Sequence, residues 1–137
     1  MAWESPLYKL PAAIAAADYR TTSKQYYCVT KNATNNQVAL ATTDGEIFIG
    51  VLQNEPLSGA AAEVTCIGVT KVVAGETLTA GDYWGTDSSG KAKIVEHTNT
   101  GADIGDYIAG VVLEGAAADE LATVTIGFPI TGRVEAA

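Results

Sequence analysis

The chain has 137 residues, 16 acidic and 8 basic side chains, and a formal net charge of −8. This length predicts one domain, and the few basic residues argue against a surface that neutralises nucleic-acid phosphates. The sequence holds 23 Ala, 16 Thr and 14 Gly, so much of its 47% apolar content is methyl groups that bury little area. A small acidic domain with a light core is therefore expected.

Charge is divided unevenly along the chain. Residues 1–31 carry a net charge of +2, whereas residues 32–137 carry −10. Such a basic front end could dock on an acidic neighbour, including a second copy, and ordinary scatter of a few charges explains it equally well. No apolar stretch approaches the roughly 20 residues that a membrane-spanning helix needs. We therefore expect no membrane partner. Glu4 precedes Lys9, which does not fit the basic start of an export signal, so we expect Cys28 and Cys66 to be reduced thiols.

The first twenty residues differ from the rest. The stretch MAWESPLYKLPAAIAAADYR contains two prolines and several large apolar side chains that follow no helical or strand period. We predict an extended N-terminal arm over residues 1–20, whose aromatic side chains either fold back on the body or pack on a partner. The candidate partner contacts in this arm are Trp3, Pro6, Leu7, Tyr8 and Lys9.

After the arm, short apolar runs alternate with turn residues about every ten positions. This spacing predicts a single all-β domain over residues 21–137, either a small barrel, a tulip-like fold or a sandwich, with little helix. Asp44-Gly45 is the strongest hairpin signal. The expected strands are Lys24–Lys31, Gln37–Thr42, Glu46–Leu52, Glu63–Val73, Thr77–Leu78, Tyr83–Thr86, Lys91–Val95, Tyr107–Leu113 and Ala122–Ile126.

Two segments of the body resemble each other. Residues 49–68 read IGVLQNEPLSGAAAEVTCIG, and residues 109–127 read AGVVLEGAAADELATVTIG. Each has Gly-Val at the start of an apolar strand, then Gly-Ala-Ala-Ala, then a Val-Thr strand that ends on Ile-Gly. The pattern predicts two similar β-turn-β units, in which glycine permits close approach of the backbone. Coincidence in an Ala- and Gly-rich chain is the alternative.

Few residues are typical of chemistry. His97 is the lone histidine and lies in a polar loop, and no nucleophile motif accompanies it. Nothing singles out a pair of carboxylates spaced for glycoside hydrolysis, and the cysteines lack the spacing of a zinc or redox site. We therefore expect a protein that is not an enzyme and that has no cofactor and no metal. Tyr83 and Trp84 are adjacent and point to opposite strand faces, and Trp84 is the candidate interface aromatic.

The order of these glycine, valine and turn segments resembles the head decoration (capsid cement) proteins of tailed bacteriophages. The resemblance covers about residues 22–127 and rests on a loose pattern. Its segments are IGV (49–51), EVTCIGV (63–69), AGETLTAGDYW (74–84), TDSSGKA (86–92) and GVVLEGAAADELATVTI (110–126). Residues 1–20 have no counterpart in it, so a capsid-gripping role for the arm is an extension beyond the resemblance.

The resemblance implies a structural virion protein without catalytic residues. Its implied partners are the major capsid protein and other copies of itself, as a homotrimer, on the exterior of an assembled capsid that it stabilises. The alternative from the residues themselves is a receptor- or glycan-binding β module of a virion or cell surface, which would use exposed Tyr and Trp as stacking platforms.

Overall fold

The computed structural model describes residues 2–96, 103–129 and 131–134. Within this part of the chain all regular secondary structure is β-strand, which confirms the all-β prediction. The strands are β1 (Ser5–Lys9), β2 (Ile14–Ala15), β3 (Cys28–Lys31), β4 (Gln37–Leu40), β5 (Gly50–Leu52), β6 (Val64–Val73), β7 (Tyr83–Thr86), β8 (Ala92–Ile94), β9 (Tyr107–Ile108), β10 (Gly110–Glu114), β11 (Leu121–Ile126) and β12 (Gly132–Arg133).

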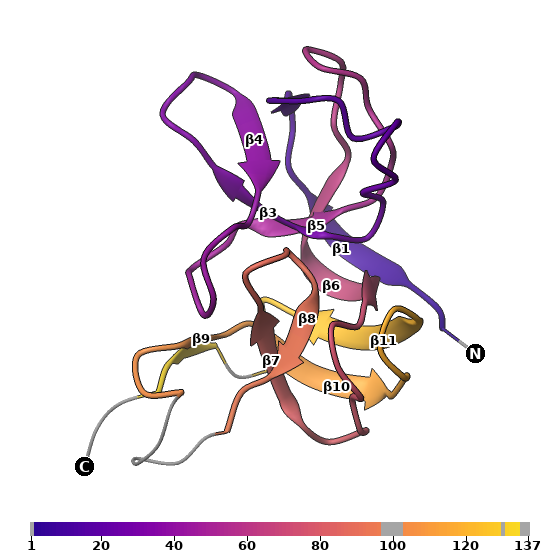
Figure 1. Cartoon of the computed structure of the whole chain (residues 1–137), viewed down its shortest axis with the longest axis vertical. Coiled ribbons are helices and arrows are strands. Elements are labelled where there is room, and N and C mark those ends of the chain that lie inside the picture. Colours follow the sequence, from indigo (N-terminus) through magenta and orange to yellow (C-terminus); the bar gives the residue numbers. More distant parts are fainter. Residues whose placement is uncertain (1, 97–102, 130, 135–137) are drawn as a thin grey trace.

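Ten of these strands form one open sheet, and β6 lies at its middle. The order is β2-β4-β3-β5-β6-β11-β10-β7-β8, with β1 also paired to β6, while β9 and β12 form a separate pair. At ten residues β6 is long enough to pair with β5 near its start and with β11 over its second half, and it also pairs with β1 from Thr65 to Val69. Figure 1 shows it joining the group of β3, β4 and β5 to the group of β7, β10 and β11.

The neighbouring strands β3 and β5 are buried on both faces. Successive side chains of a strand point to opposite faces, and here both faces meet apolar residues. Cys28 and Val51 belong to one hydrophobic cluster, whereas their neighbours Val29 and Leu52 belong to a second cluster. Along β6, Val64 lies in the second cluster and Val72 in the first. This part of the sheet therefore separates two cores.

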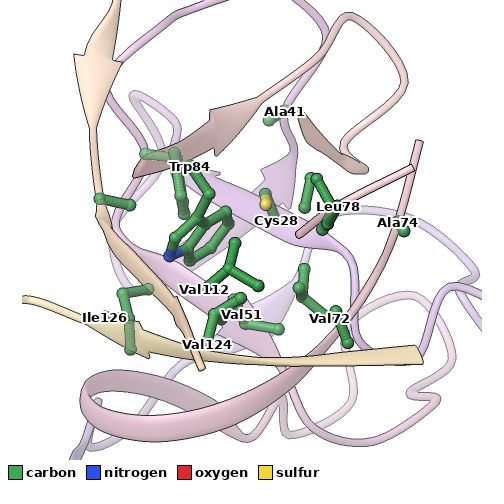
Figure 2. Packing of buried hydrophobic residues seen from close by; sticks show 14 residues of the cluster. Cys28, Ala41, Val51, Val72, Ala74, Leu78, Trp84, Val112, Val124 and Ile126 are labelled. Atoms are coloured by element: carbon green, nitrogen blue, oxygen red, sulfur yellow. The ribbon is translucent and has the colours of Figure 1, made fainter. Parts of the chain in front are cut away.

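The larger core is built around Trp84. Its side chain is fully buried, and its indole N–H donates to the carbonyl oxygen of Thr125 at 2.7 Å. The ring of Phe48 lies 5.5 Å from it, centroid to centroid. Figure 2 shows the indole among small and medium apolar side chains from several strands, including Val112 and Val124. One large aromatic thus fills space that Ala and Val side chains leave open.

The two similar segments are both antiparallel hairpins. β5 pairs with β6 in the first, β10 pairs with β11 in the second, and β6 and β11 then pair with each other. The matched glycines act alike, because a Cβ on Gly50 would overlap the carbonyl oxygen of Thr65, and one on Gly110 would overlap that of Thr125. The two segments therefore form hairpins with equivalent close contacts at their matched glycines.

The hairpin predicted at Asp44-Gly45 is wrong. A turn is present there, but β4 and β5 do not pair with each other, because both pair with β3. The turn instead packs against a distant loop. Gly45 has a φ of +72° and its Cα faces the carboxyl group of Asp106, while its N–H and C=O bond to Thr86 and Tyr107. Long-range contacts therefore decide the path of this turn.

The second half of the predicted arm belongs to the body, so residue 20 is not a structural boundary. Ala13, Ala15 and Tyr19 are buried in the second cluster, and β2 pairs with β4 in parallel. The hydroxyl oxygen of Tyr19 accepts a hydrogen bond from the N–H of Leu40 at 2.9 Å. This segment is rich in alanine, and alanine side chains are small enough to fit between strands. The extended, exposed part of the arm is confined to residues before Leu10.

Replacing Gly110 with alanine should destabilise the protein by about 1–3 kcal/mol, the usual effect of adding a methyl group where no space exists. The added Cβ would overlap both the carbonyl oxygen and the hydroxyl of Thr125. Urea unfolding followed by tryptophan fluorescence measures the change. Gly59→Ala is the comparison, because that site has open space and only its φ of +78° opposes a side chain. Equal stability of Gly110→Ala and the wild type would contradict the close-contact explanation.

Candidate docking surface

The strand β1 lies on the outside of the molecule and buries none of its own side chains. All five of its residues are exposed, and among the described strands it pairs with β6 alone. Leu7 is 75% exposed, Tyr8 50%, and Trp3 just before the strand 47%. Large apolar side chains at such exposure are unusual when they gather in one place. Figure 1 shows β1 on the outside of the fold, and the predicted contact residues Leu7 and Tyr8 belong to it, with Trp3 just before it.

Two residues that the sequence did not single out extend this surface. Tyr8 lies opposite Ile67 of β6 in the antiparallel register, so the two side chains share a face. Ile67 is 42% exposed and lies against Gly127, whose neighbour Phe128 is 37% exposed. No local pattern marks Ile67, because only the pairing of β1 with β6 brings it beside Tyr8. We call Trp3, Leu7, Tyr8, Ile67 and Phe128 the β1 surface.

A charged residue and a proline limit how a partner can bind this surface. Lys9 at the end of β1 lies 3.8 Å from the carboxylate of Glu63, and both side chains are half exposed. Pro6 has no backbone N–H, so it weakens the free edge of β1 as a template for another strand. The surface is therefore suited to contact through side chains, with a charged rim at Lys9.

Trp84 is not an interface aromatic, and that prediction is wrong. Its side chain has no exposed surface because it fills the larger core. Its neighbour Tyr83 is the partly exposed member of the pair and packs against the small cluster of Val95, Ile108 and Val134. Adjacent strand residues do point to opposite faces as expected, but the sequence alone did not tell which face is the core.

The most developed polar site surrounds Lys93. Its ammonium group donates to Asp44 at 2.8 Å and to Asp106, and it lies 3.6 Å from Asp103. Lys93, Asp44 and Asp103 border a surface pocket of about 400 Å³, which is also lined by Glu76, Asp87 and Glu96. The lysine side chain is only 12% exposed. The cluster thus ties β8 to the Asp44 turn and to the loop before β9.

Burial opposes the charge of Lys93, but hydrogen bonds to Asp106 and Asp44 outweigh it and raise the pKa of the lysine above its ordinary range. A lysine held in this way is positively charged at neutral pH and is therefore a poor base or nucleophile. The ion pairs of Lys93 join three segments of the chain, so the geometry supports a structural role for this lysine.

The two cysteines are free thiols. Cys28 is fully buried, and burial raises the pKa of its thiol, as it does for the half-buried Cys66. Among the described residues no group of three or more His, Cys, Asp or Glu side chains is arranged to hold a metal ion. His97 lies outside the described residues. In the described part of the chain no helix of membrane-spanning length and hydropathy occurs.

Comparison with solved structures identifies a related fold. The chain superimposes on the N base of the head fiber protein gp8.5 of bacteriophage phi29 with a TM-score of 0.63. The match covers 88% of this chain and 92% of the other at 17% sequence identity. The two share a fold. No protein-family model matches the sequence, and no curated protein matches it.

The ion cluster gives an alkaline pH dependence of stability. Because the pKa of Lys93 is raised on folding, its contribution is complete below the ordinary lysine pKa of about 10.4 and is lost as pH rises through the higher folded value. The difference in unfolding free energy between wild type and Lys93→Met should therefore be constant near neutrality and shrink above about pH 10.4. Urea unfolding at several pH values measures it. Lys31→Met, which removes a lysine bonded to backbone carbonyls, is the control. A difference that does not shrink at all on the alkaline side would contradict the assignment.

Proposed function

We propose that this protein is a non-enzymatic structural component of a phage virion, which binds the exterior of the assembled capsid and stabilises it. The observation that carries the proposal is the shared fold with the head fiber base of phi29, which extends over nearly the whole length of both chains. The glycine, valine and turn pattern of residues 22–127 supports it independently, because it resembles phage head decoration proteins. The major capsid protein is the proposed partner.

The β1 surface is the proposed capsid contact. Its large apolar side chains form the kind of patch that marks a protein interface, and the half-exposed Lys9 lies at its rim. The remaining predicted contact, Pro6, keeps the edge of β1 from recruiting other strands. Binding through side chains would cover Leu7 and Tyr8 without any change in the sheet.

The composition also suits a decorated particle. The net charge of −8 gives repulsion between neighbouring copies on a crowded capsid and keeps the particle soluble. A light core rich in alanine and valine leaves a modest margin of stability, which assembly as a homotrimer would increase by mass action. The proposed location is the virion, after synthesis in the host cytoplasm, with no role for nucleic acid or membrane.

A receptor- or glycan-binding function gains no specific support. That alternative would use exposed Tyr and Trp side chains as stacking platforms, and its candidate Trp84 is buried. The exposed aromatic residues of the β1 surface belong to one edge strand and its neighbours, and none of them lines the pocket beside Lys93 or the pocket beside Phe48. We therefore do not propose it.

Co-sedimentation with undecorated capsids tests the proposal. The wild-type protein should bind at micromolar concentration, and the double variant Leu7→Ser/Tyr8→Ser should bind at least about tenfold more weakly, since two interface side chains together exceed the roughly 1.4 kcal/mol that tenfold requires. Its thermal stability should stay close to wild type, because both side chains are exposed.

The matched control is Ile47→Ser/Leu57→Ser, which removes two comparably exposed apolar side chains elsewhere (55% and 44%). It should bind like the wild type. Absence of wild-type binding would contradict the capsid function itself. Equal loss in both double variants would contradict only the assignment of the β1 surface.

A further inference from the structure

The body contacts the main chain of β1 and its flanking residues through Gly68, Thr123 and Val64, and we call this binding site the β6 seat. Gly68 of β6 is buried beneath the strand, and a Cβ there would lie 2.6 Å from the backbone nitrogen of Leu7 and 2.7 Å from the carbonyl oxygen of Ser5. No residue with a side chain has room at position 68, where β1 pairs with β6. The seat therefore requires a closely apposed backbone, whatever the side chains above it.

Hydrogen bonds at both ends complete the seat. The N–H of Trp3 donates to the hydroxyl of Thr123 at 2.9 Å, and the N–H of Leu10 donates to the carbonyl oxygen of Val64 at 2.9 Å. The side chain of Thr123 is fully buried, so its hydroxyl depends on such local partners. An empty seat would expose Gly68 and leave buried polar groups without these bonds, so the body needs a strand there.

The connection between β1 and the body is short and strained. Pro11 and Ala12 follow directly after the seat, and Ala12 has a φ of +58°, a left-handed conformation that opposes its side chain. From Ala13 onward the chain is anchored in the second cluster. Pro11 and Ala12 are thus a tight hinge between an anchored segment and a strand that buries none of its own side chains.

We propose that β1 is exchanged between copies of this chain, so that residues 2–10 of one copy occupy the β6 seat of another. Exchange keeps every contact of the seat, because the incoming strand is identical, and it frees the hinge from its strained closed path. The partner surface is therefore the β6 seat of a second copy, defined by Gly68, Thr123 and the carbonyl of Val64. This inference concerns self-association and does not depend on capsid binding.

Disulfide trapping in the full chain tests the exchange. Ser5 and Val69 are direct partners in the β1–β6 register, and opposed residues of antiparallel strands are close enough for a disulfide. One chain carries Ser5→Cys and an isotope-labelled chain carries Val69→Cys, both with Cys66→Ala. The two chains are mixed at high micromolar concentration and oxidised, and peptide mass mapping locates the links.

A disulfide that joins position 5 of one chain to position 69 of the other in most of the product supports exchange. If the mixture gives no such link, and the double variant in one chain links only within itself at every concentration, exchange is excluded. The link within one chain in that case also shows that the substitutions leave the fold and the seat intact.

The hinge gives a second, independent measurement. Ala12→Gly adopts a positive φ without strain, so it should favour the closed connection and lower the interchain fraction severalfold. Ala117→Gly, in an exposed segment far from the hinge, is the matched control and should leave the fraction unchanged. An interchain fraction that is the same in Ala12→Gly and wild type would overturn hinge strain as the cause of exchange.

Discussion

The whole fold depends on two neighbouring strands, β3 and β5, that contribute to a hydrophobic cluster on each face, and on β6, which contacts one cluster near its start and the other near its end. A chain of this size with a light core cannot fill one large interior, and it instead packs two smaller clusters against the two sides of the same strands. The alternation of Val51 and Leu52 between the clusters means that each strand residue contributes to one core or the other. A slip of one residue in register would exchange the contents of both cores, so the register here is strongly specified.

Close backbone approach compensates for small side chains. Alanine and glycine contribute little buried area, so dense packing requires that strands lie near each other. Gly50 and Gly110 allow the strands to lie close together in the two repeated hairpins, and Gly68 does so where β1 pairs with β6. Trp84 then fills the remaining volume of the larger cluster. The many alanine and glycine residues therefore give a core in which main-chain atoms make close contacts as well as side chains.

Most strands of the body were predictable because they carry a run of apolar and β-branched residues between turns. The predicted strand Thr77–Leu78 is wrong, because only an isolated bridge joins Leu78 to Ala116, and β12 has no such run to mark it. What local sequence missed was decided by distant contacts. Asp44-Gly45 reads as a hairpin turn, yet it packs on Asp106. Trp84 and Tyr83 were indistinguishable until the sheet assigned one face to the core. Ile67 joined the candidate surface only through its pairing with Tyr8.

The main chain and the side chains of β1 make different kinds of contact. Its main chain fits a seat on β6 that Gly68 opens, while its large side chains remain exposed to solvent. A strand whose side chains supported its own core could not leave that core without a large loss of buried area. Because β1 buries none, the same short segment can join one copy to another through backbone atoms and still present Leu7 and Tyr8 to a further partner. The proposed self-association and the proposed capsid contact therefore do not compete for the same atoms.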